Sequence, residues 1–447
     1  MILTASVTSA APGDAAPPID ASLSGADALL PAAAIVNLPA ERLDRLMGWD
    51  LAYGVMLVAD WLTRNARLKD MPSERIALLC DKLVALGLPL DRYGSSTEVL
   101  DAEHDSISRL WVKGKGVTTR TYVRTGDDDS RYRTSPFYEA AETGQTVELR
   151  LPETEDSRFG IVAELKADGF THYLCIPIPL MNGGHGWVTF ATRSAVGFVP
   201  TDIAALARLL PAIAILIDLR STWLSLDKLL RTYVGDEPHR AILRGVTKRG
   251  QVSTIRSAIL FADMRDSIGH TVDLDAVAAV GVFNALFDCL VPPIESRGGE
   301  VLKYMGDGLL AIFRDGPNVD AVDRALAAGQ EAIAALRARN LRHPDELPIE
   351  AGVALHYGEA AYGNVGSGLR LDFTVIGKDV GLTSRIANLN RPLDQPVLMS
   401  RDFVSRLRRP AVQVGAFAVR GFRDLVEVFR PDTRDVPASA LSGADAA

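Results

Sequence analysis

The sequence predicts an α+β protein with two folded regions, and three observations support this prediction. The 447 residues, 47% of them hydrophobic, are enough for two to three domains with their own cores. Strand and helix patterns alternate in both halves, around hairpin turns such as Asn182-Gly183-Gly184 and Gly306-Asp307-Gly308. A helical stretch at 220–250 separates the two halves. The predicted regions are therefore 39–219, a linker 220–250, and 251–433.

The two ends of the chain are predicted to be disordered. Residues 1–38 are rich in Ala, Pro, Ser and Gly, and residues 434–447 continue in the same style. The N-terminal stretch lacks a basic segment before its apolar residues, so we do not expect a signal peptide.

Charge and hydropathy exclude several classes of protein. Lys and Arg number 48 against 56 Asp and Glu, a formal net charge of −8, which gives no basic surface for nucleic acid. No apolar run reaches the roughly 18–20 residues of a membrane span, so none is expected, and the run at 209–219 is interpreted as a buried helix. Cys80, Cys175 and Cys289 lie far apart in apolar segments, which indicates buried thiols and a reducing, cytoplasmic location.

The region 39–219 begins with helices and continues with strands. Apolar residues at helical spacing predict helices within 40–88. From about residue 96 the pattern changes to strands at 107–114 and 118–125. A helix is expected to begin after Ser135-Pro136 and to pass through Gly144 into a strand. A hairpin at 171–193 and a helix from 197 onward complete the region.

The linker carries an apolar stripe at helical spacing: Trp223, Leu226, Leu229, Leu230 and Tyr233. Such a stripe packs either on its own domain or against the same helix of a second subunit. We favour the second interpretation, a parallel two-helix seam.

The region 251–433 contains two short apolar strands that each end at an aspartate, Asp263 and Asp307. Glycines on both sides of Asp307 predict a hairpin tip. If the first strand lies beside that hairpin, both carboxylates emerge at one sheet edge, where they repel each other and favour Mg²⁺ or Mn²⁺. Taken alone, Asp307 is equally well interpreted as a turn residue, and Asp263 as a helix N-cap.

Three segments of this region together resemble the catalytic domain of class III nucleotidyl cyclases: FADMRDS, GGEVLKYMGDG and DFTVIGKDVGLTSRI. The resemblance covers roughly residues 250–430, with the order and approximate spacing of the family. It implies a ferredoxin-like α+β fold, a homodimer, and conversion of a nucleoside triphosphate to a 3′,5′-cyclic monophosphate and pyrophosphate.

The resemblance also implies roles for individual residues near the phosphates. Asp263 and Asp307, with the backbone carbonyl of Met264, would hold two Mg²⁺ or Mn²⁺ ions per site. Backbone N–H groups at Arg265, Asp266 and Ser267 would cradle the β- and γ-phosphates.

Base choice and charge stabilisation fall on three further positions. Lys303 and Thr374 occupy the base-selecting positions of the family, and a lysine donor with a threonine acceptor matches adenine rather than guanine. Arg385 matches the arginine that stabilises charge at the α-phosphate in the transition state. ATP is therefore the expected substrate.

The chain departs from the family pattern at three places. Gly381 stands where the family carries the asparagine that orients the ribose. Val426 stands at the position of a triphosphate-binding lysine, for which Arg420 and Arg423 are candidate replacements. Asp266-Ser267 replaces a frequent Gly-Phe pair.

The region 39–219 resembles a GAF-type sensor domain. The resemblance rests on the order of elements and on a Gly186-Trp187 strand followed by the helix start Gly197-Phe198-Val199-Pro200. It implies either a small-molecule ligand or a role in dimerisation, and the sequence identifies no ligand.

Three hypotheses follow: an adenylate cyclase governed by a GAF-like sensor, a guanylate cyclase, and a catalytically weak cyclase-homology module that binds nucleotide and signals through protein contacts. A metal-dependent phosphatase or nuclease would also pair aspartates, but it would not need Lys303, Thr374 and Arg385 at these spacings.

Overall fold

The structure, a computed structural model, describes residues 30–64, 72–100, 104–123, 129–316 and 320–432. The chain divides into two compact units, Met1–Lys228 and Leu229–Ala447, called here the N-terminal and C-terminal units. Most of the segments predicted to be disordered lie outside the described residues. Within 1–38, however, α1 (Ala32–Val36) is a helix, and Ala32 and Ile35 are buried in the core, so that part of the disorder prediction is wrong.

The N-terminal unit is built on a six-stranded antiparallel sheet in the order β3-β2-β1-β6-β5-β4. The strands are β1 (Arg92–Glu98), β2 (His104–Val112), β3 (Gly116–Val123), β4 (Val147–Arg150), β5 (His172–Pro179) and β6 (His185–Thr192). The predicted hairpin at 171–193 is confirmed as the β5–β6 pair. Strand β1 was not predicted, because Ser95, Ser96 and Thr97 give it no apolar alternation.

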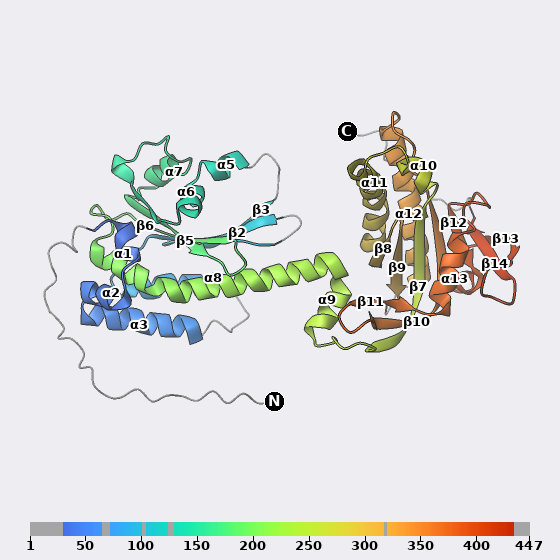
Figure 1. The fold of residues 1–447 in the computed structure, drawn as a ribbon, viewed down its shortest axis with the longest axis horizontal. Helices are drawn as coiled ribbons and strands as arrows, with labels where there is room; N and C mark the ends of the chain where they lie inside the picture. Colours follow the sequence, from blue (N-terminus) through green and yellow to red (C-terminus); the bar gives the residue numbers. More distant parts are fainter. Residues whose placement is uncertain (1–29, 65–71, 101–103, 124–128, 317–319, 433–447) are drawn as a thin grey trace. The chain divides into compact units, whose positions relative to one another are not determined.

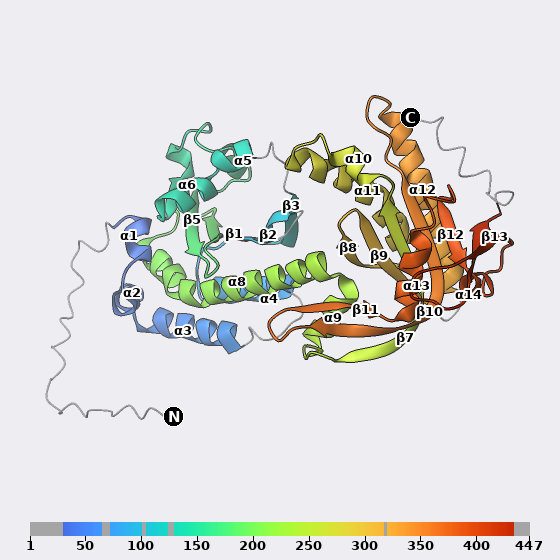
Figure 2. The same ribbon diagram turned by 45° about the vertical axis from the view of Figure 1, so that its right-hand side comes forward.

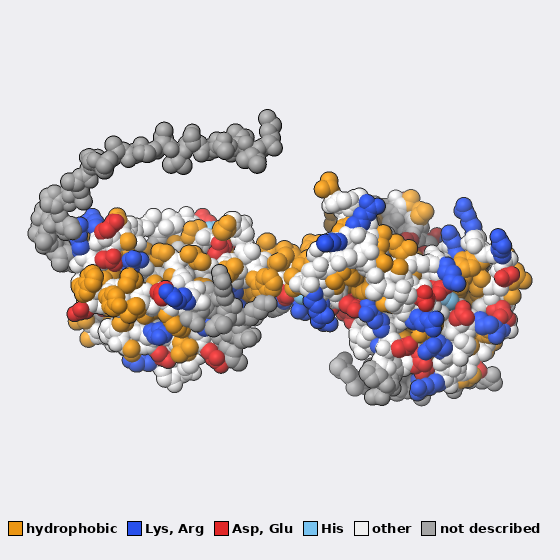
Figure 3. Space-filling view, turned by 90° about the horizontal axis from the view of Figure 1, so that it is seen from below, with side chains coloured by type: hydrophobic (Ala, Val, Ile, Leu, Met, Phe, Trp, Pro, Cys, Tyr) orange, Lys and Arg blue, Asp and Glu red, His pale blue; other side chains and the backbone are white. Residues whose placement is uncertain are grey.

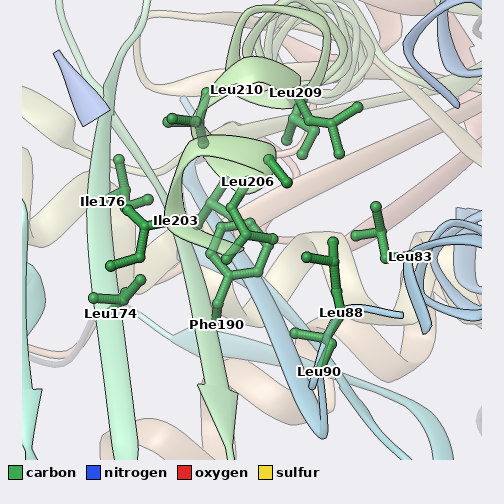
Figure 4. Close-up of a cluster of buried hydrophobic side chains, with 14 of the residues drawn as sticks. Leu83, Leu88, Leu90, Leu174, Ile176, Phe190, Ile203, Leu206, Leu209 and Leu210 are labelled. Carbon is green, nitrogen blue, oxygen red and sulfur yellow. The ribbon is translucent and has the colours of Figure 1, made fainter. Parts of the chain in front are cut away.

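Helices cover both faces of this sheet (Figure 1). One face packs against α2 (Ala40–Met47), α3 (Trp49–Arg64), α4 (Pro72–Ala85) and α8 (Pro200–Val234). Figure 4 shows this core, in which Leu206, Leu209 and Leu210 of α8 meet Phe190 and the strand residues Leu174 and Ile176. The smaller core on the other face involves α6 (Pro136–Thr143), α7 (Val162–Ala167) and neighbouring α5 (Asp129–Arg133); a 3₁₀ turn, η2 (Leu151–Glu153), follows β4.

Helix α8 runs through the predicted boundary at residue 219 without a break and ends at Val234, where α9 (Asp236–Leu243) follows. The linker is therefore helical, as predicted, but its first part continues the preceding helix. Trp223, Leu226 and Tyr233 are 47%, 43% and 81% exposed. The two-helix seam stays a prediction.

Hydrophobic side chains also gather on the surface of the N-terminal unit (Figure 3). On α3 the exposed large hydrophobic residues are Trp49, Tyr53, Met56 and Leu57. Exposed apolar surface of this kind commonly marks an interaction site.

The C-terminal unit contains a sheet in the order β13-β14-β12-β10-β7-β9-β8, with β11 paired to β10. The strands are β7 (Val252–Met264), β8 (Glu300–Met305), β9 (Gly308–Arg314), β10 (Ala351–Gly366), β11 (Leu371–Ile376), β12 (Val397–Ser400), β13 (Ala411–Phe417) and β14 (Val426–Pro431). The stretch β10-β7-β9-β8, with helices after β7 and β9, has the ferredoxin-like strand order. This prediction of the fold is confirmed.

Two long helices, α11 (Ala276–Ser296) and α12 (Ala321–Arg342), cover one face of this sheet (Figures 1 and 2). On the other face α13 (Lys378–Ala387) packs through Leu382 and Ile386 onto Ala354 of β10. Two short helices, α10 (Ser267–Thr271) and α14 (Arg401–Val404), follow β7 and β12.

Helix α11 bears on the prediction that the chain has no membrane span. Pro292 and Pro293 lie in its last turns, and the chain leaves the helix through Gly298, whose φ is +72°. In the described residues, α11 is the one helix long and apolar enough to cross a membrane by length and composition. Its residues Leu286, Cys289, Leu290 and Ile294 are buried in the core beside α12. The absence of a membrane span stays a prediction.

Candidate active site

The two predicted aspartates lie at one edge of the C-terminal sheet, as expected. Asp263 faces Gly308 across the β7–β9 pair, and the backbone N–H of Met264 donates to the carbonyl of Asp307 at 3.0 Å. Asp307 occupies the turn between β8 and β9. We call Asp263 and Asp307 the acid pair.

Glycine is required next to the acid pair. A Cβ at position 308 would lie 2.6 Å from the carbonyl oxygen of Ala262 and 2.7 Å from Oδ1 of Asp263. Since no side chain fits in this space, Gly308 lets the two strands approach closely enough to bring the carboxyl groups together.

The electrostatics of the acid pair reflect burial and repulsion. Burial, together with the negative charge of Asp307 and a hydrogen bond with it, raises the pKa of Asp263 to about 6. A cation beside two half-buried carboxyl groups this close would offset their negative charges.

The acid pair opens into a polar cavity of about 280 Å³, which we call the aspartate cavity. The turn after β7 forms one wall, and the segment after α13 forms another. The lining residues are Asp263, Met264, Arg265, Asp266, Ser267, Ile268, Asp307, Gly352, Ala387, Asn388, Asn390 and Arg391.

In the turn after β7, fewer backbone amides are free to bind phosphate than the sequence predicted. The backbone N–H of Arg265 is not available, because it donates to the carbonyl of Glu350 at 2.8 Å. The Arg265 side chain is also held, by Asp394 at 3.0 Å and by the carbonyl of Asn390 at 3.3 Å. Among the described residues, the N–H groups of Asp266 and Ser267 have no acceptor in the chain. Those two amides remain candidates for binding phosphate.

Asp266 adopts a conformation that glycine favours. Its φ is +56°, in the left-handed region, at the position where the family frequently has glycine. The turn therefore keeps the backbone shape for which glycine is suited, and adds a carboxylate that accepts from Nη2 of Arg391 at 3.4 Å.

The predicted base-selecting residues lie together on β8 and β11, outside the lining of the aspartate cavity. Nζ of Lys303 donates to Oδ2 of Asp372 at 3.1 Å. Thr374 lies two residues further along β11, hence on the same strand face as Asp372. Thr374 is buried, and within the described chain its Oγ1 has no hydrogen-bond partner. We call Lys303, Asp372 and Thr374 the base group.

Arg385 lies exposed near the C-terminal end of α13 and does not line the aspartate cavity. One turn earlier on the same helix, a Cβ at Gly381 would meet nothing within 4 Å. At the C-terminal end of the domain, Val426 begins β14, and Arg420 and Arg423 are exposed in the turn before it. Within one chain, the predicted site residues therefore form separate groups.

Four residues of these groups were missed by the sequence analysis: Asp372, Asn388, Asn390 and Arg391. Asn390 is buried, and its amide donates to the carbonyls of Val353 and Gln395 at 3.2 and 2.8 Å. The motif containing Arg385 is followed closely by Asn388, Asn390 and Arg391. These neighbouring polar residues were the sequence signal that could have identified this part of the site. Asp372 begins the motif of Thr374 and was passed over as a strand residue.

The acid pair has the chemistry of a divalent cation site, with two carboxylates and the nearby Met264 carbonyl as hard oxygen donors. In the described residues, no group of three or more His, Cys, Asp and Glu side chains forms a metal-binding cluster. A cation here would be held by the acid pair and by oxygens from the backbone, the substrate or water.

Among known proteins, the chain is similar in sequence to cyclases. No family model matches the chain. It is 34% identical over 167 residues to the adenylate cyclase of Anabaena cylindrica, a match that spans 36% of this chain and 32% of that protein. It is 26% identical over 185 residues to the terminal-differentiation-specific adenylate cyclase of Dictyostelium discoideum, which covers 38% of this chain and 8% of that protein. The chain thus spans a third or less of these relatives.

Solved structures give similar partial matches. The guanylyl cyclase Cya2 is 26% identical, with a TM-score of 0.35, over 40% of this chain and 92% of that chain. A bacterial light-regulated adenylyl cyclase is 25% identical, with a TM-score of 0.36, over 40% and 91%.

Proposed function

The chain contains a homologue of the class III adenylyl and guanylyl cyclase catalytic domains, and on this premise we propose that it is an adenylate cyclase. The proposed reaction converts ATP to 3′,5′-cyclic AMP and pyrophosphate, under the control of the N-terminal unit. The observation that carries the proposal is the acid pair, whose two aspartates lie at one edge of the sheet and line one polar cavity.

The reaction requires the ribose 3′-oxygen to attack the α-phosphorus in line with the leaving pyrophosphate. Asp263 and Asp307, with the Met264 carbonyl, would hold two Mg²⁺ or Mn²⁺ ions. When bound, these ions lower the pKa of the attacking hydroxyl and offset phosphate charge. The amides of Asp266 and Ser267 bind the phosphate oxygens, and Arg385 stabilises the charge that develops at the α-phosphate.

The base group supports adenine as the base. Lys303 offers a donor, held in place by Asp372, and Thr374 offers a hydroxyl without a partner among the described residues. These match the N1 acceptor and the N6 donor of adenine. Guanine presents the opposite pattern, and mismatched polar groups in a closed site cost roughly 1–3 kcal/mol each.

We infer that the active unit is a homodimer with composite sites. The aspartate cavity of one chain is lined by the acid pair but not by Lys303, Thr374 or Arg385. A twofold dimer brings the acid pair of one subunit opposite the base group and Arg385 of the other, and it forms two equivalent sites.

The proposal is tested with the purified full chain, Mn²⁺ or Mg²⁺, and either ATP or GTP. We expect cyclic AMP from ATP, with a kcat/KM at least about tenfold above that for GTP. A preference for GTP would make the protein a guanylate cyclase.

A weak nucleotide-binding module is the second candidate, and Gly381 and Val426 are the observations that favour it. Nucleotide binding by calorimetry without cyclic product, in either metal, would support this candidate and contradict the proposed enzyme.

A further inference from the structure

The N-terminal unit holds a larger cavity, of about 600 Å³, within the range of about 300–1,000 Å³ for small-ligand sites. It lies between the β1–β2 face of the sheet and the helices α4 and α8, and we call it the arginine cavity. The polar residues of its lining that matter below are Ser95, Thr97, Arg109, Arg220 and Asp227.

Arg109 lies on β2, next to the edge strand β3, and lines this cavity. It pairs with Ser95 in the β1–β2 register. Side chains two residues apart share a strand face, so Arg109 lies between Ile107 and Trp111 on the face that carries the large apolar core. Only 9% of Arg109 is exposed, and such burial is unusual for arginine unless the side chain is paired.

Three arginines line the cavity: Arg75, Arg109 and Arg220. Among the described residues, neither Arg109 nor Arg220 has a carboxylate within ion-pair distance, and Nε of Arg220 is buried without a hydrogen-bond partner. Burial lowers the pKa of Arg109 to about 10, helped by the positive charge of Arg220. Burial also lowers the pKa of Arg220, helped by Arg75. The acidic residue in the lining is Asp227.

An uncompensated buried charge destabilises a fold, and a guanidinium cannot relieve this by losing its proton at neutral pH. An anionic group in the cavity would pair with Arg109 and Arg220, while the hydroxyls of Ser95 and Thr97 lie on the same strand. Most of the remaining wall is aliphatic, which suits an apolar body attached to that anion.

We propose that the arginine cavity binds an amphipathic organic anion, with an acidic head on Arg109 and Arg220 and an apolar body among the side chains of α4 and α8. The proposal does not rest on the catalytic function. Helix α8 contributes Arg220 to the cavity and continues past Lys228, where the C-terminal unit begins, so a ligand here would touch an element shared by both units.

The test measures binding of dodecanoate and of uncharged 1-dodecanol to the full chain by titration calorimetry, below the concentrations at which either aggregates. The two probes share the apolar body and differ in the head. We expect dodecanoate to bind once per chain and at least about tenfold more tightly than dodecanol, because charge-assisted hydrogen bonds to arginine are strong.

Two variants assign the binding to the cavity. Arg109→Met should lower the dodecanoate affinity at least about tenfold and leave dodecanol binding unchanged. Arg120→Met, which changes an exposed arginine of β3, is the matched control and should bind as the unchanged protein does. Thermal melting verifies that each variant is folded.

Three results would overturn the proposal: no dodecanoate binding, equal affinity for both probes, or equal losses in Arg109→Met and Arg120→Met. A dimer that dissociates in Arg109→Met, without any dodecanoate binding to the unchanged protein, would instead assign the cavity to a second copy of the chain.

Discussion

The acid pair and the base group lie in the same sheet but differ in how their charges are balanced. Lys303 and Asp372 neutralise each other at 3.1 Å, which leaves the Thr374 hydroxyl as the group without a partner among the described residues. Asp263 and Asp307 carry like charges, and burial and repulsion raise the pKa of Asp263 to about 6. The charges of the acid pair therefore favour a cation, whereas the base group lacks only a hydrogen-bonding partner for Thr374.

Removing one member of the acid pair should have the largest effect. Asp263→Ala is expected to lower cyclic product formation by about 1,000-fold or more, because several kcal/mol of transition-state stabilisation depend on the cation it holds. The fold should persist, since Asp263 lies at a strand end. Asp345→Ala, at an exposed position, is the control and should keep full activity. Substantial activity in Asp263→Ala would separate the acid pair from catalysis.

A change in the base group should alter base choice rather than abolish turnover. Thr374→Ala is expected to lower kcat/KM for ATP by roughly tenfold, because the N6 donor of adenine loses its acceptor. The value for GTP should change less. Thr254→Ala, on the exposed part of β7, is the matched control. An equal loss for both nucleotides would show that Thr374 has no part in selecting the base.

A substitution at position 381 should have a smaller effect, a gain in kcat. Glycine in a helix costs up to about 1 kcal/mol relative to alanine and supplies no group to hold the ribose. A side chain there meets no atom within 4 Å, so Gly381→Asn fits without strain. We expect kcat to rise a few-fold, roughly the effect of one hydrogen bond, with Gly381→Ala as the control for helix stability. Equal rates in the two variants would exclude a specific role for the amide.

The smallest expected effect is a change in the pKa of Asp263. Asp307→Asn removes the like charge beside Asp263, so the pKa of Asp263 should fall from about 6. It should stay above the ordinary value of about 3.9, since burial, the larger cause, remains. NMR titration of the metal-free protein measures this pKa, with Asp345→Asn as the control. An unchanged titration would mean that the two carboxyl groups do not interact.

Sequence reasoning reached the acid pair because its signals are local. The Gly306-Asp307-Gly308 turn and the apolar run before Asp263 are short patterns, and strand pairing then brings their ends together. Asn390 and Arg391 were missed because their proximity to the acid pair depends on how α13 packs on the sheet.

Strand β1 escaped prediction for a related reason. Its Ser95, Ser96 and Thr97 are polar, yet they lie in a central strand whose position is set by its neighbours β2 and β6.

The central claim is that the acid pair and the base group of one active site come from two subunits. Asp263→Ala and Lys303→Ala should each be inactive or nearly so. When the two are mixed and allowed to exchange subunits, the heterodimer has one site that has lost both residues and one that has lost neither. Recovery of cyclic AMP formation in the mixture is the predicted result. If exchange is verified and the mixture stays as inactive as its components, each subunit builds its own site and the composite account is wrong.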